Sequence, residues 1–247
     1  RMIVSGHDVV ATIDGTKADV EQGYTSTGSN NTLAFENYEG KFDKVATGFE
    51  NYTAGAGSTV RVDNISTGSN TEGDTGIFAG TDNAFTLGGE GTFVAQNVTV
   101  EASNNLDVEG NLSVAGDESS ITVNEGGAAN VNAGGTVDVT EAEKLDVTKT
   151  QLNVNDGGTL NVTTEQFLAD NAFAGATLAA GATVNLNGDD EVSADQLKNK
   201  FGTGTDSQIA GIVNVESGKV TGVIDDVDTS NGTISVNNIK VMGIATD

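Results

Sequence analysis

The fold is decided by Gly-Gly-Thr-Val-Asp-Val at 134–139, Gly-Gly-Thr-Leu-Asn-Val at 157–162 and Gly-Ala-Thr-Val-Asn-Leu at 181–186. In each copy apolar residues alternate with small polar ones, which is typical of a half-buried strand. The copies start 23 and 24 residues apart, and further triplets of the same kind begin about every eight residues between Asn97 and Asn187. The motif is therefore one part of a longer repeat.

A repeat of this length predicts one coil of a stacked fold. We expect an all-β protein, a parallel β-solenoid (β-helix) with about three short strands in each coil of roughly 23–25 residues. Each strand would pair with its equivalents in the coils on either side, because isolated three-residue strands are not stable. Gly, Asn and Asp between the triplets fit the tight corners of such a coil.

Alternation along a strand also predicts which side chains face outward. The apolar members of each triplet point into the coil and the middle residue points out. Two outward columns are expected, one of Thr99, Thr122 and Asp146, and one of Ser113, Asp138, Asn161 and Asn185.

An antiparallel sandwich or barrel is the competing interpretation, because it also uses many short strands at spacings of roughly 8–12 residues. Sandwich strands are longer, near 5–6 residues, and seldom repeat one Gly-x-Thr lead-in at a fixed period. The solenoid is the favoured fold.

The regular part extends over residues 96–190, and the flanks differ from it. Residues 1–95 form a β-rich region, either a cap or wider coils, which holds most of the aromatic residues as core or as a platform for sugars. Residues 191–247 are expected to hold a helical corner and C-terminal strands or a cap. Capping-box patterns, a Ser or Thr followed three residues later by Gln, begin at Thr163 and Ser193 and predict short helices near 163–172 and 193–201.

The composition limits the classes of molecule that this chain can bind. Lys and Arg number 11 against 36 Asp and Glu, a formal charge of −25, so nucleic acid and anionic lipid surfaces are poor partners. Cysteine is absent, which excludes disulfides and thiolate chemistry. The sequence contains no apolar run long enough to span a bilayer. Because the chain begins at Arg1 without a secretion signal, we expect a processed piece of a longer precursor.

Catalytic motifs are missing from the sequence. His7 is the only histidine, so neither a His-based triad nor a multi-histidine metal site can be built. Carboxylate pairs remain formally available for glycoside hydrolysis, but they are too frequent in this chain to be informative. We expect no enzymatic activity.

Divalent cations are the one cofactor class that the acidic composition favours. The candidate calcium ligands are the clustered carboxylates Asp189, Asp190, Asp225, Asp226 and Asp228. An exposed acidic turn with no bound ion is the simpler interpretation of each cluster.

The repeats at 134–139, 157–162 and 181–186 resemble those of the β-helical passenger regions of bacterial autotransporters and other large repetitive surface adhesins. This resemblance covers residues 97–190 best. It implies secretion to a bacterial cell surface and a structural role in adhesion or assembly, with the protein's own copies, other surface proteins or glycans as partners. Two alternatives stay open: a calcium-stabilised, self-assembling filament or surface-layer subunit, and a polysaccharide-binding or polysaccharide-degrading β-helix.

Overall fold

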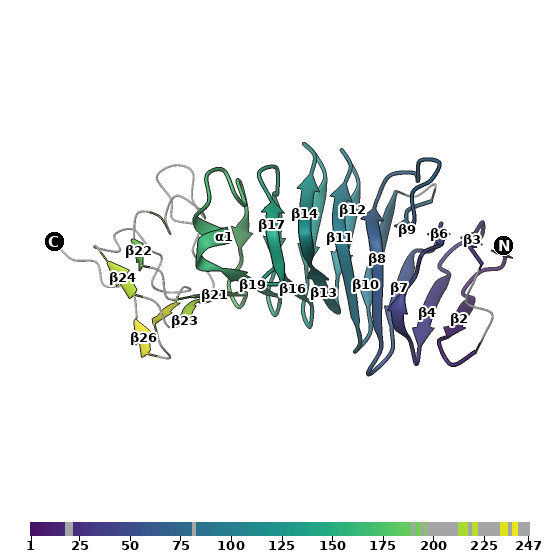
Figure 1. Cartoon of the computed structure of the whole chain (residues 1–247), viewed down its shortest axis with the longest axis horizontal. Coiled ribbons are helices and arrows are strands. Elements are labelled where there is room, and N and C mark those ends of the chain that lie inside the picture. The colour runs from purple at the N-terminus through teal and green to yellow at the C-terminus, as the bar shows by residue number, and fades with distance from the viewer. Residues whose placement is uncertain are drawn as a thin grey trace.

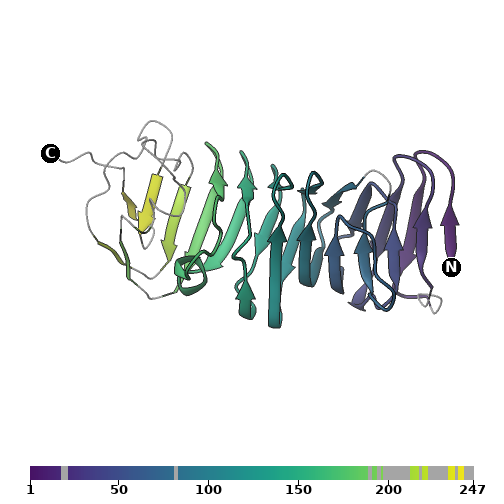
Figure 2. The same cartoon turned by 90° about the horizontal axis from the view of Figure 1, so that it is seen from above.

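A computed structural model describes residues 1–17, 22–80, 83–188, 191–193, 196, 212–216, 219–221, 233–236 and 239–241. It confirms the parallel β-solenoid. The strands lie side by side along one long axis, from the N-terminal coil at the right of Figure 1 toward the C-terminal end at its left. Figure 2, a view from above, shows the same stack.

Three faces surround the core, and each takes about one strand from each coil. The first face is the eight-stranded sheet β2 (Val10–Asp14), β4 (Thr32–Glu36), β7 (Asn51–Ala54), β10 (Ala84–Gly88), β12 (Asn105–Val108), β15 (Ala128–Val131), β18 (Leu152–Val154) and β20 (Thr177–Leu178). The second face contains β5 (Glu39–Lys41), the first half of β8 (Thr59–Ser66), the first half of β11 (Thr92–Val100), β13 (Asn111–Val114), β16 (Thr136–Asp138), β19 (Thr159–Thr163), β21 (Thr183–Asn187), β23 (Ile212–Glu216) and β25 (Thr233–Val236). The third face contains β1 (Met2–Val4), β3 (Tyr24–Ser26), β6 (Val45–Thr47), β9 (Gly76–Phe78), the second halves of β8 and β11, β14 (Gly116–Val123) and β17 (Ala142–Asp146).

Long strands join the second and third faces into one sheet. β11 pairs with β13 through residues 92–95 and with β14 through residues 97–100, so it turns a corner near Gln96. Beyond the last full coil, β22 (Glu191–Ser193) pairs with β24 (Lys219–Thr221). Pairing is parallel throughout the described strands except where β26 (Ile239–Val241) runs antiparallel to β25.

The inward side chains stack in columns at the predicted period. Val137, Leu160 and Val184 pair in succession and are no more than 1% exposed. Because each apolar side chain lies against its equivalents in the adjacent coils, a narrow aliphatic core runs through these coils.

The Gly-Gly lead-in has two separate physical causes. Gly157 has φ of +78°, in the left-handed region that favours glycine. Gly158 lies so close to the preceding coil that a Cβ atom there would be 2.3 Å from the carbonyl oxygen of Val131. The first glycine therefore makes the corner possible, and the second allows the coils to approach each other.

Residues 1–95 continue the same stack, with larger side chains in the core. The aromatic residues of this region are all buried, which confirms the core interpretation and contradicts an aromatic platform for sugars: Tyr24, Phe35, Tyr38, Phe42, Phe49, Tyr52, Phe78, Phe85 and Phe93. Phe35 makes edge-to-face contacts with Tyr38, Phe42 and Phe93, at ring-centroid distances of 5.3, 5.4 and 5.9 Å. Such contacts within a coil, and across to Phe93 in a later coil, fill a wider cross-section.

One strand of this region is out of sequence order. β9 follows β8 in the chain, yet it lies between β6 and β8 and is parallel to both. The intervening loop is held at its base, where Thr75 Oγ1 donates to Asp63 Oδ2 at 3.1 Å and Asn64 Nδ2 donates to the carbonyl oxygen of Thr75 at 3.0 Å. This insertion gives the third face one strand more than its neighbours at that level.

The first predicted helix is confirmed. α1 (Thr164–Leu168) begins after Thr163, whose Oγ1 accepts from the Gln166 backbone N–H, while the Gln166 side chain accepts from the Thr163 backbone N–H. The same reciprocal pair joins Ser193 and Gln196 at 3.1 and 2.8 Å. The rest of the helix predicted near 193–201 lies outside the described residues.

The predicted outward columns are partly right. Ser113, Asp138, Asn161 and Asn185 do pair in succession, and Asn214 extends the column. Asp146, however, pairs with Ser120 instead of Thr122. The corner between β16 and β17 determines that register, and it shifts Asp146 out of the column that contains Thr99 and Thr122.

Candidate interaction surfaces

The second face carries a continuous column of small uncharged side chains. Six successive strands place Thr59, Thr92, Asn111, Thr136, Thr159 and Thr183 at paired positions, all half-buried. The hydroxyls of these threonines form no hydrogen bond with any residue that the structure describes. We call this column the threonine column. Its hydroxyls are free to bind solvent or a partner.

An asparagine ladder runs beside the threonine column. Asn185 Nδ2 donates to Asn161 Oδ1 at 2.7 Å, and Asn214 Nδ2 donates to Asn185 Oδ1 at 2.7 Å. An asparagine side chain has two N–H donors and an oxygen that accepts twice. Each ladder bond uses one donor and one acceptor, so one of each remains on Asn185.

The first face also carries polar side chains, but these bond to one another. Asn130 donates to Asp107, Asn153 donates to Asn130, and Thr177 donates to Asn153, at 3.0, 3.0 and 2.8 Å. The threonine hydroxyl is thus used within the ladder, and the column contains a carboxylate. The first face is therefore less open to a partner than the second.

Exposed carboxylates lie beside one another on the third face, at β14 and β17. Asp117, Glu118 and Glu143 are exposed and, with Gln96 and Lys144, line an open hollow beside β14 and β17. Copies of the molecule would repel each other across this surface. Between β11 and β21, by contrast, the paired outward residues of the second face include one carboxylate, Asp138.

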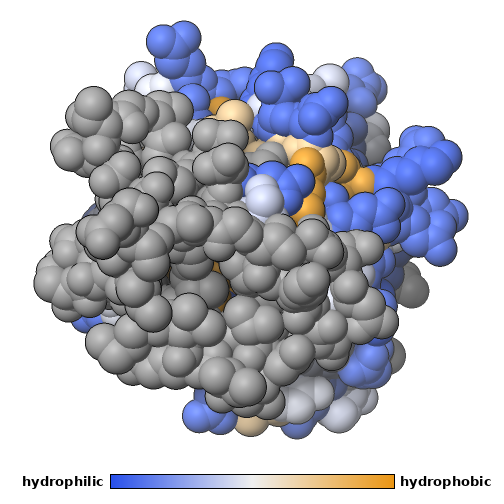
Figure 3. All heavy atoms as spheres, turned by 90° about the vertical axis from the view of Figure 1, so that its left-hand side faces the viewer, coloured by the Kyte–Doolittle hydropathy of each residue, from blue (hydrophilic) through white to orange (hydrophobic). Residues whose placement is uncertain are grey.

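The N-terminal coil exposes apolar side chains. Among the described strands, β1 pairs with β3 and β2 pairs with β4. The exposed large apolar residues of the described chain all lie in this coil: Met2 at 41%, Ile3 at 62%, Val9 at 36% and Val10 at 62%. Figure 3 gives the opposite view, from the C-terminal side, where hydrophilic residues project around much of the described rim.

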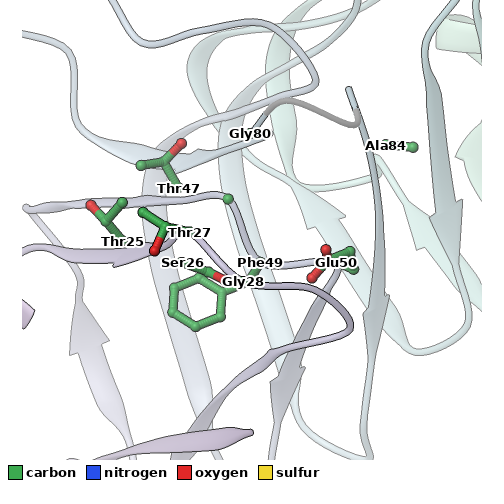
Figure 4. Close-up of a pocket in the computed structure, with 10 residues that line it drawn as sticks. Thr25, Ser26, Thr27, Gly28, Thr47, Phe49, Glu50, Gly80 and Ala84 are labelled. Atoms are coloured by element: carbon green, nitrogen blue, oxygen red, sulfur yellow. The ribbon is translucent and has the colours of Figure 1, made fainter. Parts of the chain in front are cut away.

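A shallow pocket of about 260 Å³ lies at the corner between the third and first faces. Figure 4 shows Thr25, Thr27 and Thr47 on one side of it and Glu50 on the other, and Gly28, Gly48 and Gly80 are also among its lining residues. Several of its polar groups are already used: Thr47 Oγ1 donates to the carbonyl oxygen of Ala79, and Glu50 accepts from the backbone N–H of Asn31. The pocket offers few free groups for catalysis.

The structure does not describe the sequence-predicted calcium ligands. Asp189, Asp190, Asp225, Asp226 and Asp228 lie outside the described residues. Within the described part of the chain, no group of three or more His, Cys, Asp or Glu side chains is arranged to hold a metal ion. The calcium site stays a prediction.

The lone histidine belongs to a structural corner. His7 Nδ1 lies 2.6 Å from Ser29 Oγ and accepts from the Ser29 backbone N–H at 3.2 Å. The residues that follow His7 and Ser29 are also bonded, since Asn30 Nδ2 donates to Asp8 Oδ1 at 2.6 Å. These contacts join the corners of the first two coils.

Two outward aspartates have perturbed acidity. The side-chain and backbone hydrogen bonds from Thr16 hold the pKa of Asp14 below its ordinary value near 3.8. The backbone and side-chain hydrogen bonds from Thr148 do the same to the pKa of Asp146. Both pairs are local turns at strand ends, in which the carboxylate is stabilised in its charged form.

Comparisons with known proteins add no relative: no family model, curated protein or solved structure matches this chain. Among the described residues, no helix has the length and apolar character needed to cross a membrane.

The sequence analysis did not predict the threonine column, although the Thr of each Gly-x-Thr lead-in was a signal for it.

Proposed function

We propose that this chain is a non-enzymatic structural protein of the bacterial cell surface or the extracellular space, acting in adhesion or assembly. The threonine column is the observation that carries this proposal. A stacked backbone holds its hydroxyls at the regular strand spacing of about 4.8 Å, and they have no partner among the described residues. Such a surface suits contact along the side of a rod better than turnover in a pocket.

Two further features support a role in contact. The N-terminal coil presents the exposed apolar side chains of Met2, Ile3 and Val10, and exposed apolar patches are common sites of association. The resemblance of the Gly-x-Thr repeats to those of secreted β-helical adhesins agrees with a surface location. The acidic composition makes nucleic acid an unsuitable partner, and we propose no direct insertion of this chain into a membrane.

Display on a bacterium that does not aggregate would test this function. Cells carrying the chain on their surface should settle faster, or attach better to surfaces coated with proteins or glycans, than cells carrying the export machinery alone. Equal behaviour of the two strains in settling and in attachment would refute a role in adhesion or assembly.

A calcium-stabilised filament or surface-layer subunit is the second candidate, favoured by the charge of −25. Electron microscopy of the purified chain in millimolar calcium, and again after chelation, would identify it. Fibres or sheets that disappear on chelation would support this candidate, and separate rods under both conditions would contradict it.

A polysaccharide-binding or polysaccharide-degrading β-helix is the third candidate. The aromatic side chains of the described N-terminal coils are buried, so they offer no platform on which sugar rings could stack. A glycan array combined with a turnover assay separates the cases. Binding without cleavage would indicate a lectin-like adhesin, and bond cleavage would overturn the non-enzymatic proposal.

A further inference from the structure

A hollow of about 440 Å³ lies at the N-terminal end of the third face, apart from the threonine column. Its lining residues come from four places in the sequence, beside β1, β3, β6 and β9, and these strands are neighbours in that order in the stack. Two of the lining residues are cations, Arg1 and Lys44. We call this feature the Arg1 hollow.

Both cations of the Arg1 hollow keep hydrogen-bond donors for a ligand. Arg1 Nε and Nη2 donate to Thr25 Oγ1 at 2.9 and 2.7 Å, which holds the guanidinium against the second coil. A guanidinium has five N–H donors, so three remain. Lys44 Nζ lies 4.0 Å from Asp43 Oδ1, beyond hydrogen-bond distance. Among the described residues, neither cation has a closer acidic partner.

Lys41 and Arg61, two further cations of the N-terminal coils, are already paired. Lys41 Nζ lies 2.9 Å from Asp63 Oδ1, and Arg61 Nη1 donates to Glu39 Oε1 at 3.1 Å. The chain has 36 acidic against 11 basic residues, so its surface as a whole repels anions. The Arg1 hollow is a local exception, because two incompletely paired cations lie together there.

The other polar groups of the hollow favour an acidic sugar over a bare anion. Asp43 also lines the hollow, and its carboxylate would repel sulfate or phosphate but accept from a hydroxyl. The side-chain amide of Asn70 both donates and accepts. Thr47 Oγ1 donates to the carbonyl oxygen of Ala79 at 3.0 Å, so its oxygen keeps acceptor capacity. A ligand with one anionic group and several hydroxyls meets the cations and the carboxylate with suitable partners.

The Arg1 hollow borders the pocket of Figure 4, because Thr25 and Thr47 line both. In that pocket the Thr27 hydroxyl forms no hydrogen bond with a described residue, and Glu50 accepts from the backbone N–H of Asn31 through Oε2, which leaves Oε1. These groups would contact a neutral sugar linked to the acidic one. An oligosaccharide should therefore bind more tightly than a single sugar.

We propose that the Arg1 hollow binds an acidic sugar. The ligand's carboxylate contacts Arg1 and Lys44, and its hydroxyls contact Asp43 and Asn70. Arginine and lysine bind carboxylates through charge-assisted hydrogen bonds, which are stronger than those between neutral groups. The site adds one class of glycan to the proposed role in adhesion. Because the hollow and the threonine column lie on different faces, the two can be tested separately.

Titration of the purified chain with sodium glucuronate, followed by amide NMR, tests the assignment. We expect saturable shifts at Thr25 and Asn70, with a dissociation constant on the order of 1 mM for a ligand of this size. Glucose has a similar ring without the carboxylate, and sodium acetate has the carboxylate without the ring. Each should bind at least about tenfold more weakly than glucuronate. A disaccharide of glucuronate and a neutral sugar should bind more tightly than glucuronate alone.

Three substitutions locate the binding site. Arg1→Gln and Lys44→Gln should each raise the dissociation constant for glucuronate about tenfold, because each removes a charge-assisted hydrogen bond. Lys144→Gln is the matched control, since it removes the same charge from the third face outside the hollow, and it should leave binding unchanged. Circular dichroism establishes that each variant is folded.

The assignment has clear contrary outcomes. Absence of saturable glucuronate binding, or an equal loss of binding with Lys144→Gln, would overturn it. Binding of sodium sulfate or acetate as tight as that of glucuronate would also overturn it, because charge alone would then explain the site. Settling and attachment of displaying cells remain a separate test of the proposed function, and attachment to protein-coated surfaces would support that function even without a sugar site.

Discussion

Asn185 donates its side-chain N–H to Asn161 Oδ1 across one coil, at 2.7 Å. Asn185 also accepts from Asn214 at the same distance. Asn185→Ala removes both bonds, and a typical intramolecular hydrogen bond contributes about 0.5–1.5 kcal/mol. We expect a loss of about 1–2 kcal/mol in the free energy of unfolding, measured by urea denaturation.

Asn187→Ala is the matched control for the ladder, because Asn187 lies on the same strand and face but takes no part in the ladder bonds. Its effect should stay within about 0.5 kcal/mol. Equal losses in the two variants would contradict a specific contribution from the ladder.

The inward and outward positions of β19 should respond oppositely to charge. Leu160 is 1% exposed, between Val137 and Val184. Leu160→Asp buries an unpaired carboxylate, which costs several kcal/mol, and should abolish the native circular dichroism of the central coils. Asn161→Asp, one residue further and outward, should keep it. A native spectrum for Leu160→Asp would be incompatible with the stacked core.

Two adjacent threonines at the start of α1 should have opposite effects. Thr164 is fully buried, and its Oγ1 is the one buried side-chain polar atom of the described residues without a hydrogen-bond partner. Thr164→Val keeps the shape and removes the unsatisfied hydroxyl, so it should raise stability by about 1 kcal/mol. The neighbouring Thr163→Val removes the helix N-cap and should lower stability by about 1 kcal/mol. Thermal melting of both variants checks this pair, and a lower melting temperature for Thr164→Val would contradict it.

Acid should weaken the turn at the end of β17. Hydrogen bonds from Thr148 lower the folded-state pKa of Asp146 below its ordinary value near 3.8. The carboxylate's stabilising contribution is therefore complete above that ordinary value and is lost as the pH falls through the lower folded-state pKa. The melting temperature should decrease below about pH 4, along with the contributions of other carboxylates.

Thr148→Val isolates this turn, because it removes the side-chain bond and leaves the backbone bond from residue 148. The pKa of Asp146, followed by carboxyl-carbon NMR, should rise toward its ordinary value. Thr122→Val on the same face is the control and should leave that pKa unchanged. An Asp146 pKa that does not respond to Thr148→Val would contradict the hydrogen-bond origin of the shift.

The central coils were predictable because their pattern is local. Alternation identifies Val137, Leu160 and Val184 as inward, and the 23- to 24-residue period aligns them, since each coil repeats the same corners. The helix at Thr163 was predictable for a similar reason, because a capping box involves residues only three apart.

The prediction of the outward columns from the sequence was wrong where neighbouring coils differ in length. Asp146 pairs with Ser120, 26 residues earlier, and so departs from the 23-residue step that joins Thr99 to Thr122. A local pattern does not specify such a step, because the extra residues are absorbed at a corner whose conformation depends on packing.

The sequence by itself determined the period, the inward and outward residues of the regular coils, the capped helix and the acidic, cysteine-free character of the chain. Each of these depends on side-chain type at short range or on composition. Only the tertiary structure decided the register of Asp146, the insertion of β9 between β6 and β8, the burial of the aromatic side chains and the alignment of the threonine column on the second face. These depend on which coils lie against each other, because contacts between residues 20 or more apart form only once the stack is built.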